Sequence, residues 1–161
     1  MNNLSIIIPN WNGERQLKKN LPLLFNVLAK FNGESEVIII DDQSEDGSRG
    51  YLEELKKERN LAAFGGQNLS RQGRDEIRIS RSKFPNFKVI FNNKNLGFGK
   101  SVNKGVKAAR YDIVFLLNTD VEVKTGCFEH ILPHFEKKDV FGVGANADWL
   151  VGRGQFINGY F

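Results

Sequence analysis

Apolar and polar residues along this chain fall into blocks of the length expected for strands and helices. Two short β-branched runs, Leu4–Ile8 and Glu36–Ile40, are apolar without alternation, as in strands buried on both faces of a parallel sheet. Between them an apolar residue recurs every three or four positions, which predicts a helix of roughly 18 residues. Its apolar stripe comprises Leu17, Leu21, Leu24, Leu28 and Phe31, and Pro22 is expected to bend or interrupt it. The pattern predicts a β-α-β unit.

The periodic pattern then continues into a second helix and stops. Asp46 is a good N-cap, so a helix is expected after it, fading near Asn60. Residues 61–87 are rich in Gly, Ser, Asn and Arg without a sustained period, and we interpret them as a loop insertion. Its basic residues are Arg71, Arg74, Arg78, Arg81 and Lys83. A solvated loop is favoured over contact with an anionic acceptor or a membrane.

Strands and helices alternate again in the second half of the chain. We expect strands at 87–91 and 111–117, helices at 99–109 and around 128–135, and a short fifth strand at Val140–Ala145. This alternation predicts one α/β domain over residues 1–161, a doubly wound, mostly parallel sheet flanked by helices. In such sheets ligands bind at the carboxyl ends of the strands.

Composition narrows the class of protein only slightly. The chain has 161 residues, 40% of them hydrophobic, which is enough for one core. A net charge of +4 is compatible with an anionic ligand, although on charge alone a slight lysine excess on a solvated surface is favoured, and no nucleic-acid partner is expected. A single cysteine, Cys127, excludes an internal disulfide framework. The N-terminus lacks the basic region of a signal peptide, so the chain is expected to be cytoplasmic.

Polar residues follow every predicted strand, as the carboxyl-end rule requires of a binding site. The segments are Pro9–Glu14, Asp41–Ser48, Asn95–Gly105 and Asn118–Asp120. Parallel strands bring these segments to one edge of the sheet, where they gather several carboxylates, asparagines, a tryptophan and a lysine. Helix capping and turn formation account for single members of this set, but not for the clustering.

The segment "NLGFGKSVNKG" after the third expected strand contains Gly99-Lys100-Ser101, the triplet that closes a phosphate-binding P-loop. A P-loop requires a glycine five residues before its Gly-Lys pair, and Lys94 stands there. A dinucleotide fingerprint fails as well, because its third glycine position holds Val102. We therefore reject both an NTPase and a dinucleotide-binding enzyme.

Four motifs, in order and each at a strand end, resemble those of the family 2 glycosyltransferases, which have the GT-A nucleotide-sugar-binding fold. They are "SIIIPNWNGE", "VIIIDDQSEDGS" (close to V-D-D-x-S-x-D-G-[ST]), "NLGFGKSVNKG" (close to N-x-G-x-x-x-A-x-N-x-G) and "LLNTDVEV", the D-x-D region. The resemblance runs from Leu4 to about Ala145.

This resemblance implies roles for the residues after the first two strands. Pro9 and Trp11 would line the base pocket, where an indole stacks well on a base. Asp42 would accept a hydrogen bond from a pyrimidine N3–H, and Asp41 would support the loop. The alternative for these acids is capping of the next turn, which suits Asp46 better.

In the D-x-D region the resemblance implies that Asp120 binds Mg²⁺ or Mn²⁺, which neutralises the donor diphosphate. Asn118 replaces the first acid and would hydrogen-bond a ribose hydroxyl. An ordinary Asn-Asp turn after a buried strand is the alternative. Asn10, Glu14 and Thr119 share these strand ends and complete this part of the expected donor site.

In the loop after the third strand, Gly97 would let the donor approach, Asn103 would brace the loop, and Lys100 would reach a phosphate. Val102 stands where many relatives carry arginine, so a contact made there by arginine is missing.

The implied activity is metal-dependent transfer, with inversion, of a sugar from a UDP- or dTDP-sugar to a glycan or lipid-linked acceptor, as in polysaccharide biosynthesis. Such a chain would work in the cytoplasm, with peripheral association at the inner face of the membrane left open. The family's general base normally lies further beyond the D-x-D region than this sequence extends, so we expect it outside the sequence and the chain to be truncated. Asp148 lies in no recognisable catalytic context.

Two alternatives to this activity stay open. One is a non-catalytic nucleotide- or glycan-binding module of the same fold, which Asn118, Val102 and the missing general base favour modestly. The other is a nucleotidyltransferase, although "PNWNGE" lacks the glycine-rich signature expected after its first strand.

Overall fold

The computed structural model describes residues 3–63 and 86–144. The chain divides into two compact units, Met1–Gly126 and Cys127–Phe161. All candidate site residues named above lie in the first unit, so its architecture is the relevant one.

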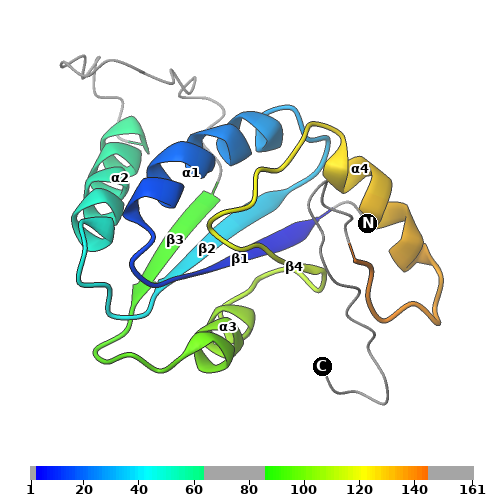
Figure 1. The fold of residues 1–161 in the computed structure, drawn as a ribbon. Coiled ribbons are helices and arrows are strands. Elements are labelled where there is room, and N and C mark those ends of the chain that lie inside the picture. Colours follow the sequence, from blue (N-terminus) through cyan, green and yellow to red (C-terminus); the bar gives the residue numbers. More distant parts are fainter. Residues whose placement is uncertain (1–2, 64–85, 145–161) are drawn as a thin grey trace. The chain divides into compact units, whose positions relative to one another are not determined.

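The first unit is built on a four-stranded parallel sheet. Its strands are β1 (Leu4–Asn10), β2 (Ser35–Asp41), β3 (Asn86–Phe91) and β4 (Val114–Leu116), in the order β3-β2-β1-β4. Figure 1 shows α1 (Glu14–Leu28) and α2 (Ser48–Ala63) on one face of the sheet and α3 (Phe98–Lys107) on the other. Helices on both faces of a parallel sheet confirm the predicted doubly wound α/β class.

The two central strands, β1 and β2, are apolar on both faces of the sheet because helices pack against both faces. On the face toward α1, Phe25 packs against Phe87 with ring centroids 6.0 Å apart. On the α3 side Ile7, Ile38 and Ile40 form a fully buried cluster. The non-alternating isoleucine runs of β1 and β2 therefore pack on both faces, as the sequence pattern predicted.

The prediction of a strand over 111–117 was too long. The structure has only Val114–Leu116 as β4, because the residues before it are held by side chains at the amino ends of β1 and β2. The Tyr111 amide donates to Ser5 Oγ over 3.1 Å, and Ser5 Oγ in turn donates to Glu36 over 2.6 Å. These bonds replace the strand ladder at the start of β4.

Helix boundaries also differ from the prediction. α1 ends at Leu28, before Phe31, and it continues through Pro22. α2 extends to Ala63 and β3 begins at Asn86, so the ends of the predicted 61–87 insertion belong to regular elements. The remainder of that segment, with its basic residues, lies outside the described residues, and so does Asp148.

In the second unit the predicted helix around 128–135 is two short elements, α4 (Cys127–Ile131) and a 3-10 helix, η2 (Leu132–Glu136). Pro133 has no N–H to continue the α-helical bonding, which explains the change. The predicted strand at Val140–Ala145 is wrong for 140–144, the described part of it, where Gly142 and Gly144 disfavour a strand. None of the helices within the described ranges is long and apolar enough to cross a bilayer.

Candidate functional site

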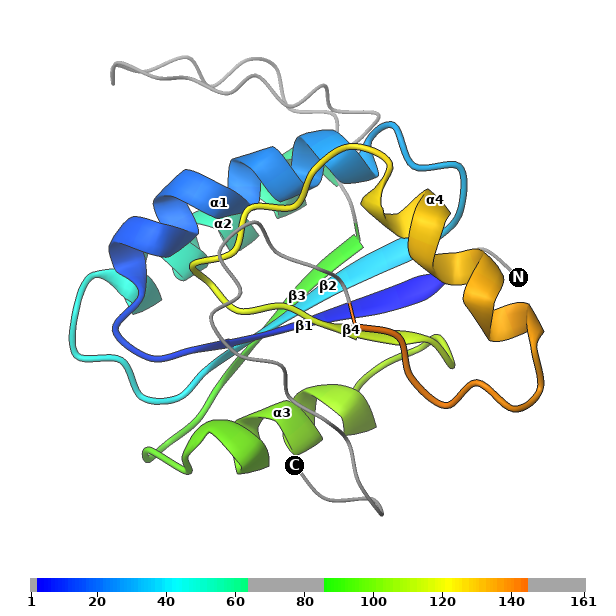
Figure 2. The same ribbon diagram turned by 45° about the vertical axis from the view of Figure 1, so that its right-hand side comes forward.

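The connections that follow the four strands gather at one edge of the sheet, which is on the left in Figure 2. In a doubly wound sheet this carboxyl edge is where ligands bind. The side chains of the connections bond to one another across large separations in sequence, so this edge is a braced structure.

The loop after β1 and the loop after β2 are cross-linked through Asn12 and Ser44. Asn12 Oδ1 accepts from the Glu45 amide at 2.8 Å, and Ser44 Oγ accepts from the Asn12 amide at 2.9 Å. Asn12 has a positive φ of 52° and Gln43 one of 60°, so both turns directly after β1 and β2 adopt a conformation that few residues tolerate. Such conformations persist only where neighbouring bonds fix them, as they do here.

Asp41 and Asn10 are the buried residues that connect the loops after β1 and β2. Asn10 Nδ2 donates to Asp41 Oδ1 over 2.8 Å, and Ser44 Oγ donates to the same oxygen over 2.6 Å. Asp41 thus holds the loop that follows it. Asn10 Oδ1 is buried and has no partner among the described residues.

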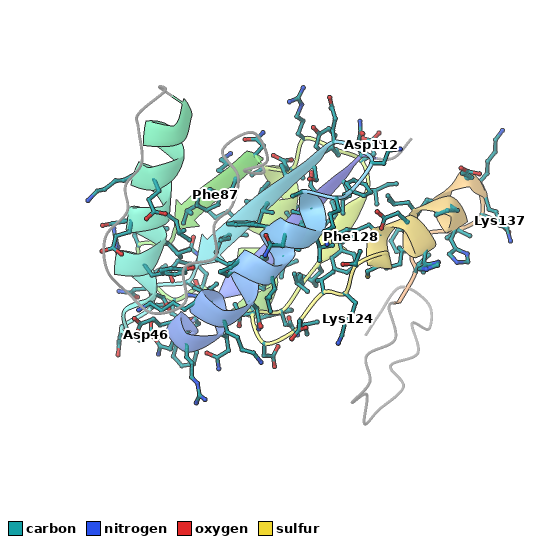
Figure 3. The ribbon with its side chains drawn as sticks, turned by 90° about the horizontal axis from the view of Figure 1, so that it is seen from above. Asp46, Phe87, Asp112, Lys124, Phe128 and Lys137 are labelled. Carbon is teal, nitrogen blue, oxygen red and sulfur yellow. The ribbon has the colours of Figure 1, made fainter. Side chains whose placement is uncertain are left out.

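Asp46 joins the starts of two helices. Its Oδ2 accepts from the Glu14 amide and its Oδ1 from the Ser48 amide, each at 2.9 Å. Burial raises the pKa of Asp46, but its hydrogen bonds, with those from Ser48 and Glu14 foremost, outweigh burial and lower the pKa. Asp46, the predicted N-cap, lies one residue before the N-cap position, which Gly47 occupies, but its carboxylate still caps the first amide of α2 and also that of α1. Figure 3 places Asp46 at the end of the sheet where α1 begins.

Asp42 holds the loop between β3 and α3. Only 4% of it is exposed, and its carboxylate accepts from the amides of Leu96 and Gly97, both at 2.8 Å. Burial raises the pKa of Asp42, but hydrogen bonds from Leu96, Asn92, Ser101 and Gly97 outweigh burial and lower it. The group is thus an ionised acceptor around neutral pH.

Asn92 completes the same network from the end of β3. Its Nδ2 donates to Asp42 Oδ1 over 2.8 Å and to Ser101 Oγ over 3.0 Å, while its Oδ1 accepts from Lys104 Nζ at 2.6 Å. One buried amide therefore connects β2, β3 and α3.

This network also supports the rejection of a P-loop. In a P-loop the amides at the helix N-terminus bind phosphate. Here the Gly97 amide, at the N-cap of α3, donates to the Asp42 carboxylate. Gly97 has a φ of 82°, which suits glycine, and this conformation turns its amide toward Asp42.

Asn118, Thr119 and Asp120 form a turn after β4. The Val121 amide donates to the Asn118 carbonyl over 3.3 Å, and Asn20 Nδ2, from α1, donates to the Thr119 carbonyl over 2.8 Å. Asp120 is exposed, and no side chain or amide in the described part of the chain bonds its carboxylate.

A divalent cation fits this turn only together with other oxygen ligands. Residues 3–63 and 86–144 contain no group of three or more His, Cys, Asp or Glu arranged to hold a metal. Hard cations take oxygen ligands and accept many of them from substrate phosphates. Asp120 brings one carboxylate, without a bonded partner among the described residues, and one carboxylate suits a cation that arrives with a diphosphate.

The other predicted site residues are close in sequence to these loops but make fewer contacts. Trp11, which directly follows β1, is 62% exposed. Pro9 is half-buried in β1, and Lys100 and Asn103 are exposed on α3. Glu14 Oε1 accepts from Lys18 Nζ at 2.6 Å, so an ion pair engages this carboxylate. The donor contacts assigned to these residues stay predictions.

Sequence reasoning missed several residues that organise this edge: Asn12, Asn20, Gln43, Ser44, Asn92 and Ser101. Asn92 directly follows a strand, so the carboxyl-end rule had marked its position. Asn20 falls three residues after Leu17 on the apolar stripe of α1, where a polar residue is itself a signal.

Comparison with known proteins agrees with this fold. The model of the family "Glycosyl transferase family 2" matches residues 5–152. A protein of Nostoc sp. named "Uncharacterized glycosyltransferase alr2836" is 29% identical over 155 residues, which are 96% of this chain and 39% of that protein.

Solved structures show the same fold at lower identity. S. aureus TarS 1–349 superposes with a TM-score of 0.57 at 23% identity, over 90% of this chain and 38% of that one. The complex of TarS 1–349 with UDP gives a TM-score of 0.56 at 22% identity, again over 90% of this chain and 38% of the other. The chain thus spans about two fifths of the length of these relatives. It belongs to glycosyl transferase family 2.

Proposed function

We propose that this chain forms the nucleotide-sugar-binding part of a metal-dependent, inverting glycosyltransferase. The observation that carries the proposal is the braced carboxyl edge, from which Asp120 presents an unpaired carboxylate. The donor is a UDP- or dTDP-sugar, and the acceptor is a glycan or a lipid-linked glycan. A cytoplasmic location, at the inner face of a membrane, stays a prediction from the sequence.

Asp120 would hold the cation, which neutralises the charge of the departing diphosphate when bound. The amide of Asn118 adds a neutral oxygen that suits a ribose hydroxyl. Trp11 offers an exposed indole at the end of β1 on which a base can stack. These residues would bind and orient the donor. We assign none of them as the base that deprotonates the acceptor.

Asp42 would accept hydrogen bonds both from the loop after β3 and from the nucleotide base. Its Oδ2 accepts from the Gly97 amide, and a carboxylate oxygen can accept more than one hydrogen bond. Because the pKa of Asp42 is lowered, the group stays an acceptor and suits the imide N3–H of uracil or thymine. This argument favours uridine and deoxythymidine donors over others.

Calorimetric titration of the chain tests the proposal. UDP, dTDP and GDP are titrated with and without Mn²⁺ into the wild type, into Asp120→Ala and into the control Asp112→Ala. We expect binding of UDP or dTDP that Mn²⁺ strengthens, a loss of the Mn²⁺ effect in Asp120→Ala, and no loss in Asp112→Ala. Equal binding with and without Mn²⁺, or an unaffected Asp120→Ala, would contradict the metal role.

A second candidate is a non-catalytic nucleotide-binding module of the same fold. Asn118 favours it, because an amide at the first D-x-D position brings no charge to the cation. The two functions differ in turnover. Release of free sugar from the bound donor by the protein would exclude the non-catalytic module.

A further inference from the structure

Asn20 is a polar residue on the apolar face of α1. The other buried residues of this helix are Leu17, Leu21, Leu24, Phe25, Val27 and Leu28. Asn20 is 8% exposed, so its amide is almost fully removed from water. Burying an amide is unfavourable unless both its oxygen and its nitrogen are bonded.

The Asn20 amide is bonded on one side only. Nδ2 donates to the Thr119 carbonyl over 2.8 Å, across 99 positions of sequence. Oδ1 is buried and has no partner within the described ranges. Beside it is a hollow of about 10 Å³, lined by Leu21, Leu24 and Leu117 among others, with room for one water molecule.

A leucine at position 20 would therefore be more stable than asparagine if packing alone mattered. What asparagine adds is the bond to Thr119, the residue between Asn118 and Asp120. The turn has two further anchors: the Leu117 amide donates to the Ile7 carbonyl over 2.9 Å, and the Val121 amide closes the turn on Asn118. Asn20 is thus the side chain that fixes the turn to α1.

We propose that Asn20 is a positioning residue, which holds the Asn118–Asp120 turn so that the Asp120 carboxylate stays at the carboxyl edge, where a nucleotide-bound cation can reach it. The inference rests on the proposed function of Asp120. Mutation of a side chain that orients a metal-binding residue without touching the metal typically weakens metal affinity by a factor of about 10–100.

The test is Asn20→Leu in the full chain, followed by two measurements. Calorimetry with UDP should show a Kd that is weaker by about 10- to 100-fold in Mn²⁺, with little change when Mn²⁺ is absent. Urea unfolding should show a stability equal to or above that of the wild type, because the unpartnered amide oxygen is gone. A merely structural residue would lose stability and leave the Mn²⁺ effect intact.

Two further variants make the result specific. Leu24→Met lines the same hollow and conserves volume, so its UDP affinity should match the wild type. In the Asp120→Ala background Asn20→Leu should not weaken UDP binding further, because both residues act through the same contact of Asp120 with the cation. Asn20→Ala gives the same affinity readout if the leucine variant does not fold.

The outcomes separate the two proposals. Unchanged affinity of Asn20→Leu, beside a wild type whose binding depends on Mn²⁺ and Asp120, overturns the positioning role alone. A wild type without Mn²⁺-dependent binding overturns the proposed function and the positioning role together.

Discussion

Asp42 organises the binding edge through backbone amides that lie more than 50 positions further along the chain. Its bonds to Leu96 and Gly97 hold the start of α3, and Asn92 orients the carboxylate from the side. An acid that sequence analysis assigns to a ligand thus also supports the architecture. Changing it should alter stability, and the pH dependence of that change shows what the charge of Asp42 contributes.

Asp42→Asn should lower the free energy of unfolding by about 1–3 kcal/mol at pH 7, because an amide nitrogen cannot accept from Leu96 or Gly97. The folded pKa of Asp42 is lowered below the ordinary value of about 3.9. Its ionised form therefore stabilises the fold above that value, and this contribution is lost as the pH falls through the folded pKa. Urea unfolding should give a constant difference between wild type and variant from pH 7 to 5 and a shrinking difference below about pH 4.

Asp112→Asn is the matched control, because Asp112 is exposed and lies at the opposite end of the sheet from Asp46 (Figure 3). We expect it to change the free energy of unfolding by less than about 0.5 kcal/mol. A difference for Asp42→Asn that persists undiminished at pH 3 would show that the charge of Asp42 is not what stabilises the loop.

Single residues of the site were predictable to different degrees. Asp41, Asp42 and Asp120 stand at strand ends, and the carboxyl-end rule selects such positions from apolar runs alone. The backbone partners of Asp42, the amides of Leu96 and Gly97, were not predictable, because their position depends on how the loop after β3 folds. The same holds for Asn20, whose contact with Thr119 exists only once α1 packs against the turn after β4.

At the scale of elements, α3 lies close to the sheet because Gly105 has no side chain. A Cβ at this position would lie 2.5 Å from Ile7 Cγ2 and 2.6 Å from Ile40 Cδ1. The apolar cluster of Ile7, Ile38 and Ile40 is therefore in direct contact with the helix backbone. The distance of α3 from the sheet also sets the position of the loop that Asp42 binds.

Gly105→Ala should lower the free energy of unfolding by about 1–2 kcal/mol, since overpacking of a tight core outweighs the helix propensity gained. Gly99→Ala is the control in the same helix, where a Cβ meets no atom within 4 Å. It should be neutral or stabilise by up to about 1 kcal/mol. Denaturant unfolding of both variants measures the effects, and equal stabilities would mean that α3 shifts away from the sheet at no cost.

Elements with strongly patterned sequences were the ones that sequence predicted best. β1 and β2 are dense in isoleucine, and both were found with extensions of one or two residues. β4 was shortened because Ser5 and Glu36 bond the amides before it, which no local pattern records. The strand expected at Val140–Ala145 rested on two valines and a phenylalanine that are interrupted by Gly142 and Gly144.

At the scale of the molecule, the candidate site is assembled from four connections that are far apart in sequence. Residues of α1, of the loops after β1, β2 and β3, and of the turn after β4 all belong to the unit Met1–Gly126. No single segment can form the site alone. Because the folded unit is a precondition of binding, a ligand of this edge should stabilise the whole unit against unfolding.

Nucleotide with cation is therefore expected to raise thermal stability more than nucleotide alone, and the cation alone should not raise it. A ligand at 100 times its Kd adds about 2.7 kcal/mol to the free energy of unfolding, which for a chain of this size is a shift of roughly 5–10 °C in Tm. Mn²⁺ alone should give no shift, because the described residues bring Asp120 and no cluster of three ligands to the cation. UDP with Mn²⁺ should give the full shift, EDTA should reduce it, and Asp120→Ala should show only what UDP gives without metal. A shift with Mn²⁺ alone that Asp120→Ala abolishes would instead mean that the chain itself supplies a complete metal site, and the dependence on the diphosphate would be wrong.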